Sequence, residues 1–178
     1  TLLLADSNGL TVRRYWDCDY PRKTLSFPPE REVEAIAEVG RLLDESVRLR
    51  TRADVPLACY LSGGVDSSAV LGMAARYSRV TAFTIAFEHA DYDESARAAE
   101  MAAHVGADFH AVPVSSKALA EAFVPSVVAG EGLVYNGHAP ARLLLSRAVS
   151  QAGFKSALGG EGADELFAGY HFAETALH

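Results

Sequence analysis

The chain has 178 residues, of which 49% are hydrophobic and 22% are charged, and its formal net charge is −7 at pH 7. This length and composition are typical of one globular domain with a buried core. The acidic balance argues against a surface built to bind the phosphate backbone of a nucleic acid. The two cysteines, Cys18 and Cys59, have no metal-binding or redox spacing, so we expect no disulfide framework or zinc site. We expect Cys59 to pack as a small hydrophobic residue.

No apolar stretch of the sequence approaches the ~18 residues that a membrane-spanning helix needs. The N-terminus also lacks a basic segment followed by an apolar signal core. We therefore expect a cytoplasmic protein without a membrane partner. Because the sequence begins at Thr1 without a methionine and stops soon after a glycine-rich segment, we expect a piece of a longer chain, truncated at its C-terminus.

The first 29 residues contain two short strand-like pieces, at 2–4 and 11–16, with a turn signal at Asn8-Gly9 between them. A proline-containing stretch follows at 21–29. We interpret residues 1–29 as a linker or as the tail of a preceding domain, and we expect the globular domain over residues 30–178. Within it, apolar residues first recur at helical spacing, which predicts an amphipathic helix over residues 30–50.

Short apolar runs then alternate with helical segments along the chain. Strands are expected at residues 55–61, 80–87, 109–114 and 155–158. Helices are expected at residues 68–77, 95–105, 117–128 and 139–151. Strands that alternate with helices pair in parallel through right-handed crossovers, so the sequence predicts an α/β fold with a doubly wound, mainly parallel sheet. Ligands of such sheets bind at the carboxyl ends of the strands.

The segment YLSGGVDSSAV, residues 60–70, joins the first of these strands to the following helix. Unpaired N–H groups at a helix start, together with glycines that admit a close approach, predict an anion site. Asp66 would repel a phosphate unless a divalent cation lay between them, which suggests magnesium. A tight turn at Gly63-Gly64 followed by helix capping explains the same composition, so that interpretation stays open. The segment lacks the lysine of a Walker A loop, which argues against a kinase or GTPase.

The segment LGGEGADELFAGY, residues 158–170, repeats this arrangement. A short strand and the Gly159-Gly160 turn are followed by three acids at a helix start: Glu161, Asp164 and Glu165. Ordinary N-terminal capping accounts for such acids as well. In a doubly wound sheet both turns could face one crevice, with Asp66 and Asp164 at a shared metal ion and Glu161 near the reacting atoms.

These two segments in combination closely resemble the signatures of the C-terminal synthetase domain of glutamine-dependent asparagine synthetases. SGGVDSS resembles the pyrophosphate-binding loop of that family, and GGEGADELFAGY resembles its second signature. The likeness extends over about residues 11–178 and includes AFTIAFE and YDESARAAEMAAHVG. It implies a sheet of the adenine nucleotide alpha hydrolase-like type, found in the PP-loop ATP pyrophosphatases.

The resemblance also implies a reaction. An acceptor carboxylate, with aspartate as the default, would be adenylated by ATP with release of pyrophosphate. Ammonia would then displace AMP to give an amide. The implied cofactors are ATP and Mg²⁺, and the implied partners are a small carboxylate, ammonia and a glutaminase domain in the full-length protein. The N-terminal cysteine of a glutaminase and the later catalytic lysine of the family have no counterpart here, so we expect the chain to bind nucleotide better than it turns over.

Site roles follow from the resemblance, position by position. Pyrophosphate would be held by Ser62, Gly63, Gly64, Asp66 and Ser67. Adenine would contact Tyr60 and Ile85, and the nucleotide would lie against Gly159 and Gly160. Glu161 would accept a proton from ammonia, while Asp66 and Asp164 would bind magnesium. Gly159 departs from the serine common at its position, which removes a hydroxyl group.

Two further hypotheses remain. One keeps the adenylation but changes the acceptor, as in relatives that close β-lactam or macrolactam rings in natural-product pathways; the other is a non-catalytic nucleotide-binding module. Three polar residues before and within the helix at 139–151 could contact an acceptor, although a polar helix-start loop explains them equally: Asn136, His138 and Arg142. The acids Asp91, Asp93 and Glu94 are typical of a helix start rather than of a metal site.

Overall fold

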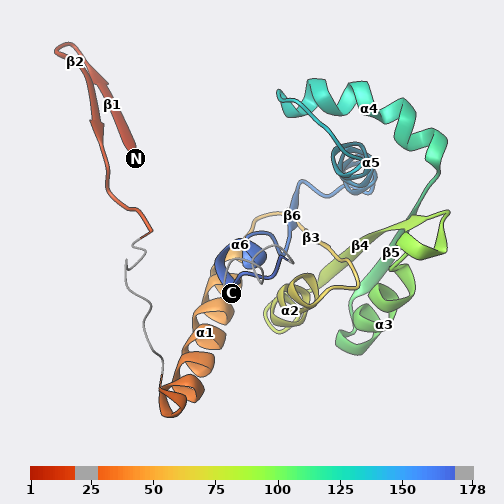
Figure 1. Ribbon diagram of the computed structural model, residues 1–178, viewed down its shortest axis with the longest axis horizontal. Coiled ribbons are helices and arrows are strands. Elements are labelled where there is room, and N and C mark those ends of the chain that lie inside the picture. Colours follow the sequence, from red (N-terminus) through yellow and green to blue (C-terminus); the bar gives the residue numbers. More distant parts are fainter. Residues whose placement is uncertain (19–27, 171–178) are drawn as a thin grey trace. The chain divides into compact units, whose positions relative to one another are not determined.

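The computed structural model describes residues 1–18 and 28–170 (Figure 1). Contacts divide the chain into two units, residues 1–40 and 41–178. The first unit contains an antiparallel hairpin of β1 (Leu2–Asp6) and β2 (Gly9–Arg13). The strand expected at 11–16 is therefore shifted, because it begins at the turn glycine Gly9, with φ of 124°, and ends at Arg13. Residues 19–27 of the expected linker or tail lie outside the described residues, and the expected boundary at residue 30 stays a prediction.

The first helix, α1 (Pro29–Arg50), runs from one unit into the other and confirms the helix expected over 30–50. Glutamates in its first turn and arginines in its last turn complement the helix dipole. Of the apolar positions that suggested an amphipathic face, Val47 is buried, whereas Val33 and Ile36 are exposed. The helix therefore contributes to the core through its C-terminal part.

The second unit is built on a parallel sheet in the order β5-β4-β3-β6. Its strands are β3 (Leu57–Tyr60), β4 (Val80–Phe87), β5 (Asp108–Val114) and β6 (Ser156–Leu158). Its helices are α2 (Val65–Ala74), α3 (Ser95–Val105), α4 (Ser116–Gly130), α5 (His138–Gln151) and α6 (Ala163–Phe167), with a 3₁₀ turn η1 (Ala90–Tyr92). The predicted doubly wound α/β fold is confirmed (Figure 1).

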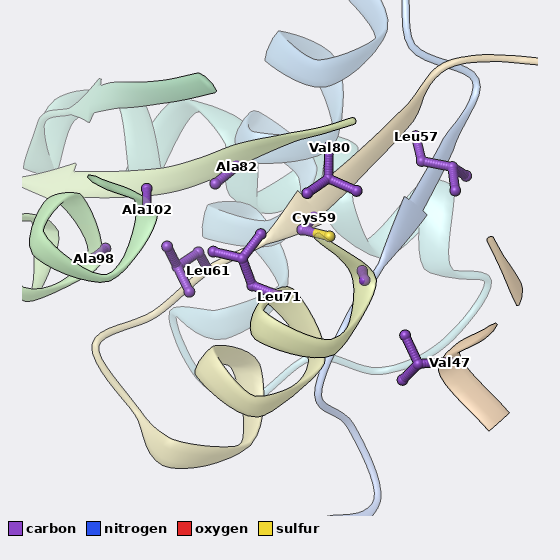
Figure 2. Close-up of a cluster of buried hydrophobic side chains, with 10 residues drawn as sticks. Val47, Leu57, Cys59, Leu61, Leu71, Val80, Ala82, Ala98 and Ala102 are labelled. Carbon is purple, nitrogen blue, oxygen red and sulfur yellow. The ribbon is translucent and has the colours of Figure 1, made fainter. Parts of the chain in front are cut away.

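Side-chain alternation along the central strands divides the core between the two faces of the sheet. On one face, apolar residues of β3 and β4 pack with α2, α3 and Val47, as Figure 2 shows for Cys59, Leu71 and Ala98. On the other face, Ala58 and Phe83 pack against Leu145 and Val149 of α5. Because successive strand residues point to opposite faces, both layers of helices cover the same four strands. Among the described residues, no helix is both long enough and apolar enough to cross a bilayer.

Two boundaries near the first glycine turn differ from the sequence prediction. β3 begins at Leu57 rather than at 55, because its parallel partners start opposite that residue, at Val80 and Ser156. The following helix begins at Val65 rather than at 68, so the first helical turn includes Asp66. It ends at Ala74 rather than at 77. After Ala74 the chain forms a tighter turn, with backbone hydrogen bonds between residues three apart.

The sheet order identifies a topological switch point. The chain passes outward from β3 to β4 and β5 and then returns to place β6 on the opposite side of β3. In open parallel sheets, the connections on the two sides of such a point diverge and leave a crevice at the carboxyl ends of the strands. The two glycine turns directly follow β3 and β6, so both border this crevice.

Cys59 provides a test of the core. Its side chain is 1% exposed, and burial raises the pKa of the thiol to about 11. At pH 8 only roughly one Cys59 side chain in a thousand is then a thiolate, the reactive form. We expect a thiol-specific colorimetric reagent to modify Cys59 at least ~100-fold more slowly than the partly exposed Cys18. A Cys18→Ser variant isolates the slow thiol, and equal rates for both thiols in the folded protein would contradict the described core.

Candidate functional site

A cavity of about 1070 Å³ opens at the carboxyl ends of β3, β4 and β6. Residues from both glycine turns and from the two central strands line it. Nine of the eleven site residues expected from the sequence are among them: Tyr60, Ser62, Gly64, Asp66, Ser67, Ile85, Gly159, Gly160 and Glu161. The structure thus brings together segments about 100 residues apart in the chain, as the parallel pairing of β3 with β6 requires.

The first turn of α2 forms one side of the cavity. Its N-cap residue is Gly64, and no side chain caps the helix. By contrast, α4 is capped by Ser115, whose hydroxyl accepts a bond from the Ala118 amide at 3.1 Å. The hydroxyl groups of Ser62 and Ser67 lie 2.9 Å apart and hold the turn closed on itself. An uncapped helix start facing a cavity can accept an anion.

The second glycine turn touches the first through Gly160. A Cβ on this residue would lie 2.7 Å from both the carbonyl carbon of Asp66 and the amide nitrogen of Ser67. No side chain fits at that distance, so glycine is required for the turn after β6 to rest on the start of α2. The neighbouring Gly159 is under no such constraint, because its nearest contacts would be side-chain atoms at 3.8 and 3.9 Å.

Gly63 occupies a different environment from the one expected. It is not among the residues that line the cavity. Its N–H donates to the Glu94 carboxylate at 3.3 Å, and a Cβ on it would lie 3.0 Å from Cβ of Arg97. The glycine therefore allows the loop to pack on the start of α3. Glu94, expected only as a helix-start acid, lines the cavity.

A set of polar contacts joins β3, α5 and the second turn. The Tyr60 hydroxyl lies 2.9 Å from the hydroxyl of Ser146 on α5. One helical turn earlier, Arg142 places its guanidinium carbon 5.9 Å from the centre of the Tyr60 ring. The same guanidinium donates to the Glu161 carboxylate at 2.6 Å. The aromatic ring expected to contact adenine is thus fixed at its hydroxyl and lies beside a cation.

The two proposed metal-binding acids lie in different surroundings. Asp66 lines the cavity, whereas Asp164 is not among the lining residues, and its carboxylate occupies the place that a Cβ on Gly169 would take. Within residues 1–18 and 28–170, no group of three or more His, Cys, Asp or Glu side chains could hold a metal ion. Magnesium commonly takes one or two carboxylates together with phosphate oxygens and water, so Asp66 fits a metal that arrives with a phosphate ligand.

Three cavity residues that follow β4 were not expected from the sequence, namely Glu88, His89 and Tyr92. The Glu88 carboxylate accepts a bond from the amide of Ser116 at 3.0 Å, and the ring of His89 lies 3.4 Å from the hydroxyl of the same serine. Their position directly after a parallel strand could have revealed Glu88 and His89, because ligand-binding residues gather at strand ends. The contacts with α4 required the tertiary structure.

The family model described as asparagine synthase matches residues 38–178. Amidase chyE from Penicillium rubens is 40% identical over 172 residues, which cover 88% of this chain and 25% of that protein. Amidase chry2 from Gibberella zeae is 37% identical, with 88% and 26% covered. A glutamine-hydrolyzing asparagine synthetase 3 from Bacillus subtilis is 27% identical, with 98% and 30% covered. The chain spans about a quarter of the length of these relatives.

Solved structures share the fold. The NH3-dependent NAD synthetase from Campylobacter jejuni, in complex with nitrate, aligns with a TM-score of 0.51 and 17% identity, covering 75% of this chain and 60% of that one. The glutamine-dependent NAD+ synthetase from Acinetobacter baumannii, in complex with ADP, aligns with a TM-score of 0.50 and 20% identity, covering 94% and 31%. These likenesses confirm the expected type of parallel sheet.

The requirement for glycine at position 160 can be tested by substitution. Gly160→Ala forces the two turns apart, and we expect it to lower the free energy of unfolding by about 1–3 kcal/mol, the usual cost of overpacking. Gly159→Ala is the matched control, because its Cβ meets only ordinary contacts at 3.8 Å or more. Urea titrations followed by circular dichroism measure both. Equal stability of the two variants would show that the turns do not meet as described.

Proposed function

Because this chain belongs to the asparagine synthase family, we propose that its cavity is the synthetase site of an ATP-dependent amide-forming ligase. An oxygen of the acceptor carboxylate attacks the α-phosphorus of ATP, the bond to the β-phosphate breaks, and pyrophosphate leaves. The nitrogen of ammonia then attacks the carbonyl carbon of the acyl-adenylate, and the carbon–oxygen bond to AMP breaks. With aspartate as the acceptor, the product is asparagine.

The observation that carries this proposal is the contact of Gly160 with the Asp66–Ser67 peptide group. It puts both glycine turns on one cavity, at the place where parallel sheets bind ligands. Two independent capping turns would explain the composition of each segment separately, but they would not explain a backbone-to-backbone contact between them. The contact therefore favours a shared ligand site.

The first turn fits the phosphates of a nucleotide. Its uncapped helix start offers backbone N–H groups, and Ser62 and Ser67 add hydroxyl groups beside them. We assign adenine contacts to Tyr60 and Ile85, which line the cavity where β3 and β4 lead into it. The ADP bound to the Acinetobacter NAD+ synthetase, a protein of the same fold, supports an adenine nucleotide as the ligand.

Magnesium is the proposed metal, with Asp66 of the cavity wall as its first protein ligand. Asp164 is the second proposed ligand, although its side chain lies outside the lining and would have to turn toward the cavity to reach the ion. When bound, the ion would neutralise negative charge on phosphate oxygens. The residues of the chain provide the remaining chemistry of the site. They hold the phosphates, orient the adenine and place Glu161 on the cavity wall, where its carboxylate accepts the proton that ammonia loses as the amide forms.

A second candidate function changes only the acceptor. The two relatives named amidases are 40% and 37% identical to this chain, and a putative glutamine-hydrolyzing asparagine synthetase from Mycobacterium tuberculosis is 35% identical. The names of the two amidases support, beside aspartate, an acceptor of the kind processed in natural-product pathways. In either case we propose that ammonia is supplied by a glutaminase domain, as the name of the Bacillus relative indicates for that protein. We propose a cytoplasmic location for the enzyme.

Nucleotide binding is the first test. We expect Mg-ATP to bind in calorimetric titrations, and we expect Asp66→Asn and Asp164→Asn each to weaken binding at least ~10-fold, since even outer-shell groups at metal sites contribute that much. Asp54→Asn is the control, because Asp54 is an exposed acid before β3 and does not line the cavity. Unchanged affinity in the Asp66 variant would exclude the cavity as the magnesium-nucleotide site, and binding without turnover would favour a non-catalytic module.

Glu161→Gln separates the two half-reactions. The variant keeps the shape of the side chain but cannot take up a proton at neutral pH, so amide formation should fall ~100-fold or more. Adenylation does not require this base, so acceptor-dependent exchange of pyrophosphate into ATP should persist. Isotope exchange and amide detection in the same samples measure the two steps. An equal loss of both steps would assign Glu161 a role in nucleotide binding instead.

A further inference from the structure

The cavity wall carries an excess of negative charge. Four of the described residues that line it have carboxylate side chains: Asp66, Glu88, Glu94 and Glu161. Arg142 is the single lysine or arginine among the described lining residues. Two histidines, His89 and His138, line the cavity as well. A carboxylate ligand that enters this cavity is repelled from most directions, so its binding needs a nearby cation.

Arg142 is held in place by the wall itself. It lies on α5 one turn before Ser146, and both residues contact Tyr60 of β3. Because the serine fixes the Tyr60 hydroxyl at 2.9 Å, the aromatic ring offers a fixed surface to the guanidinium group. Helix and strand are both parts of the core, through Leu145 and Ala58. The cation is therefore oriented toward the cavity before any ligand arrives.

The present partner of Arg142 is easily replaced. Its contact with Glu161 is short, at 2.6 Å, but the two side chains are 53% and 75% exposed. Ion pairs this open to water contribute little to stability and exchange partners readily. A guanidinium group has five N–H donors in a planar fork that matches a carboxylate, so a second carboxylate can bind beside or in place of the first.

We propose that Arg142 binds the carboxylate group of the acceptor substrate, and that Glu161 forms an ion pair with the guanidinium group until the acceptor carboxylate replaces it. This inference rests on the proposed function and names the residue that recognises the substrate. The exchange has a consequence for the chemistry. Once the acceptor carboxylate has replaced it, Glu161 is free beside the reacting carbonyl group, where it accepts the proton from ammonia.

The exchange can be observed without turnover, in nuclear magnetic resonance spectra of the side-chain Nε–H groups of arginine. The Arg142 signal is assigned by its absence from Arg142→Lys. Sodium acetate, L-aspartate and sodium benzoate serve as probes, titrated at constant ionic strength. We expect at least one probe to shift the Arg142 signal with saturation. In Glu161→Gln the probe concentration at the midpoint of this shift should fall about 2- to 5-fold, the range that corresponds to loss of an exposed competing ion pair.

Arg147 is the internal control, because it lies on the same helix, is exposed and does not line the cavity. Its signal, assigned with Arg147→Lys, should not saturate with any probe. An Arg142 signal that no carboxylate moves, or equal midpoints in the wild type and Glu161→Gln, would overturn the inference. Calorimetry with Mg-ATP on the wild type tests the proposed function separately, because it measures nucleotide binding directly and the carboxylate titration does not.

Discussion

The close approach of Gly160 to the peptide group between Asp66 and Ser67 is the constraint on which the site depends. β3 and β6 are neighbours in the sheet, so their carboxyl ends lie side by side although the chain between them contains two further strands and four helices. A side chain at position 160 would separate the turns that follow these strands. With glycine there, the start of α2 and Glu161 after β6 border the same cavity.

The two layers of helices support this cavity in different ways. α2 and α3 pack on one face of the sheet, and through Gly63 the loop after β3 rests on the start of α3. α5 packs on the other face through Leu145 and Val149, and from there it presents Arg142 and Ser146 to Tyr60. The phosphate-binding side and the acceptor-binding side that we propose thus belong to opposite faces of one sheet.

Several features of the site could be predicted from the sequence because they are local. Glycines after a strand-like run, and acids at the start of a helix, indicate an anion site and a metal site without knowledge of the fold. The environment of Gly63 could not be predicted in this way, since its N–H bonds to Glu94, 31 residues further along the chain. Nor could the ion pair between Arg142 and Glu161, which joins a helix to a turn across the cavity.

The sequence by itself determined the alternation of strands and helices, and therefore the parallel sheet and the end of it that binds ligands, because these follow from local periodicity and from the handedness of the chain. It also determined which segments carry glycines and carboxylates. Only the tertiary structure decided that the two turns meet backbone to backbone, that Arg142 opposes the acids of the cavity, and that Asp164 lies outside the lining. Such contacts depend on strand order and on which side chains fill the space between elements, and neither is encoded in any short stretch of residues.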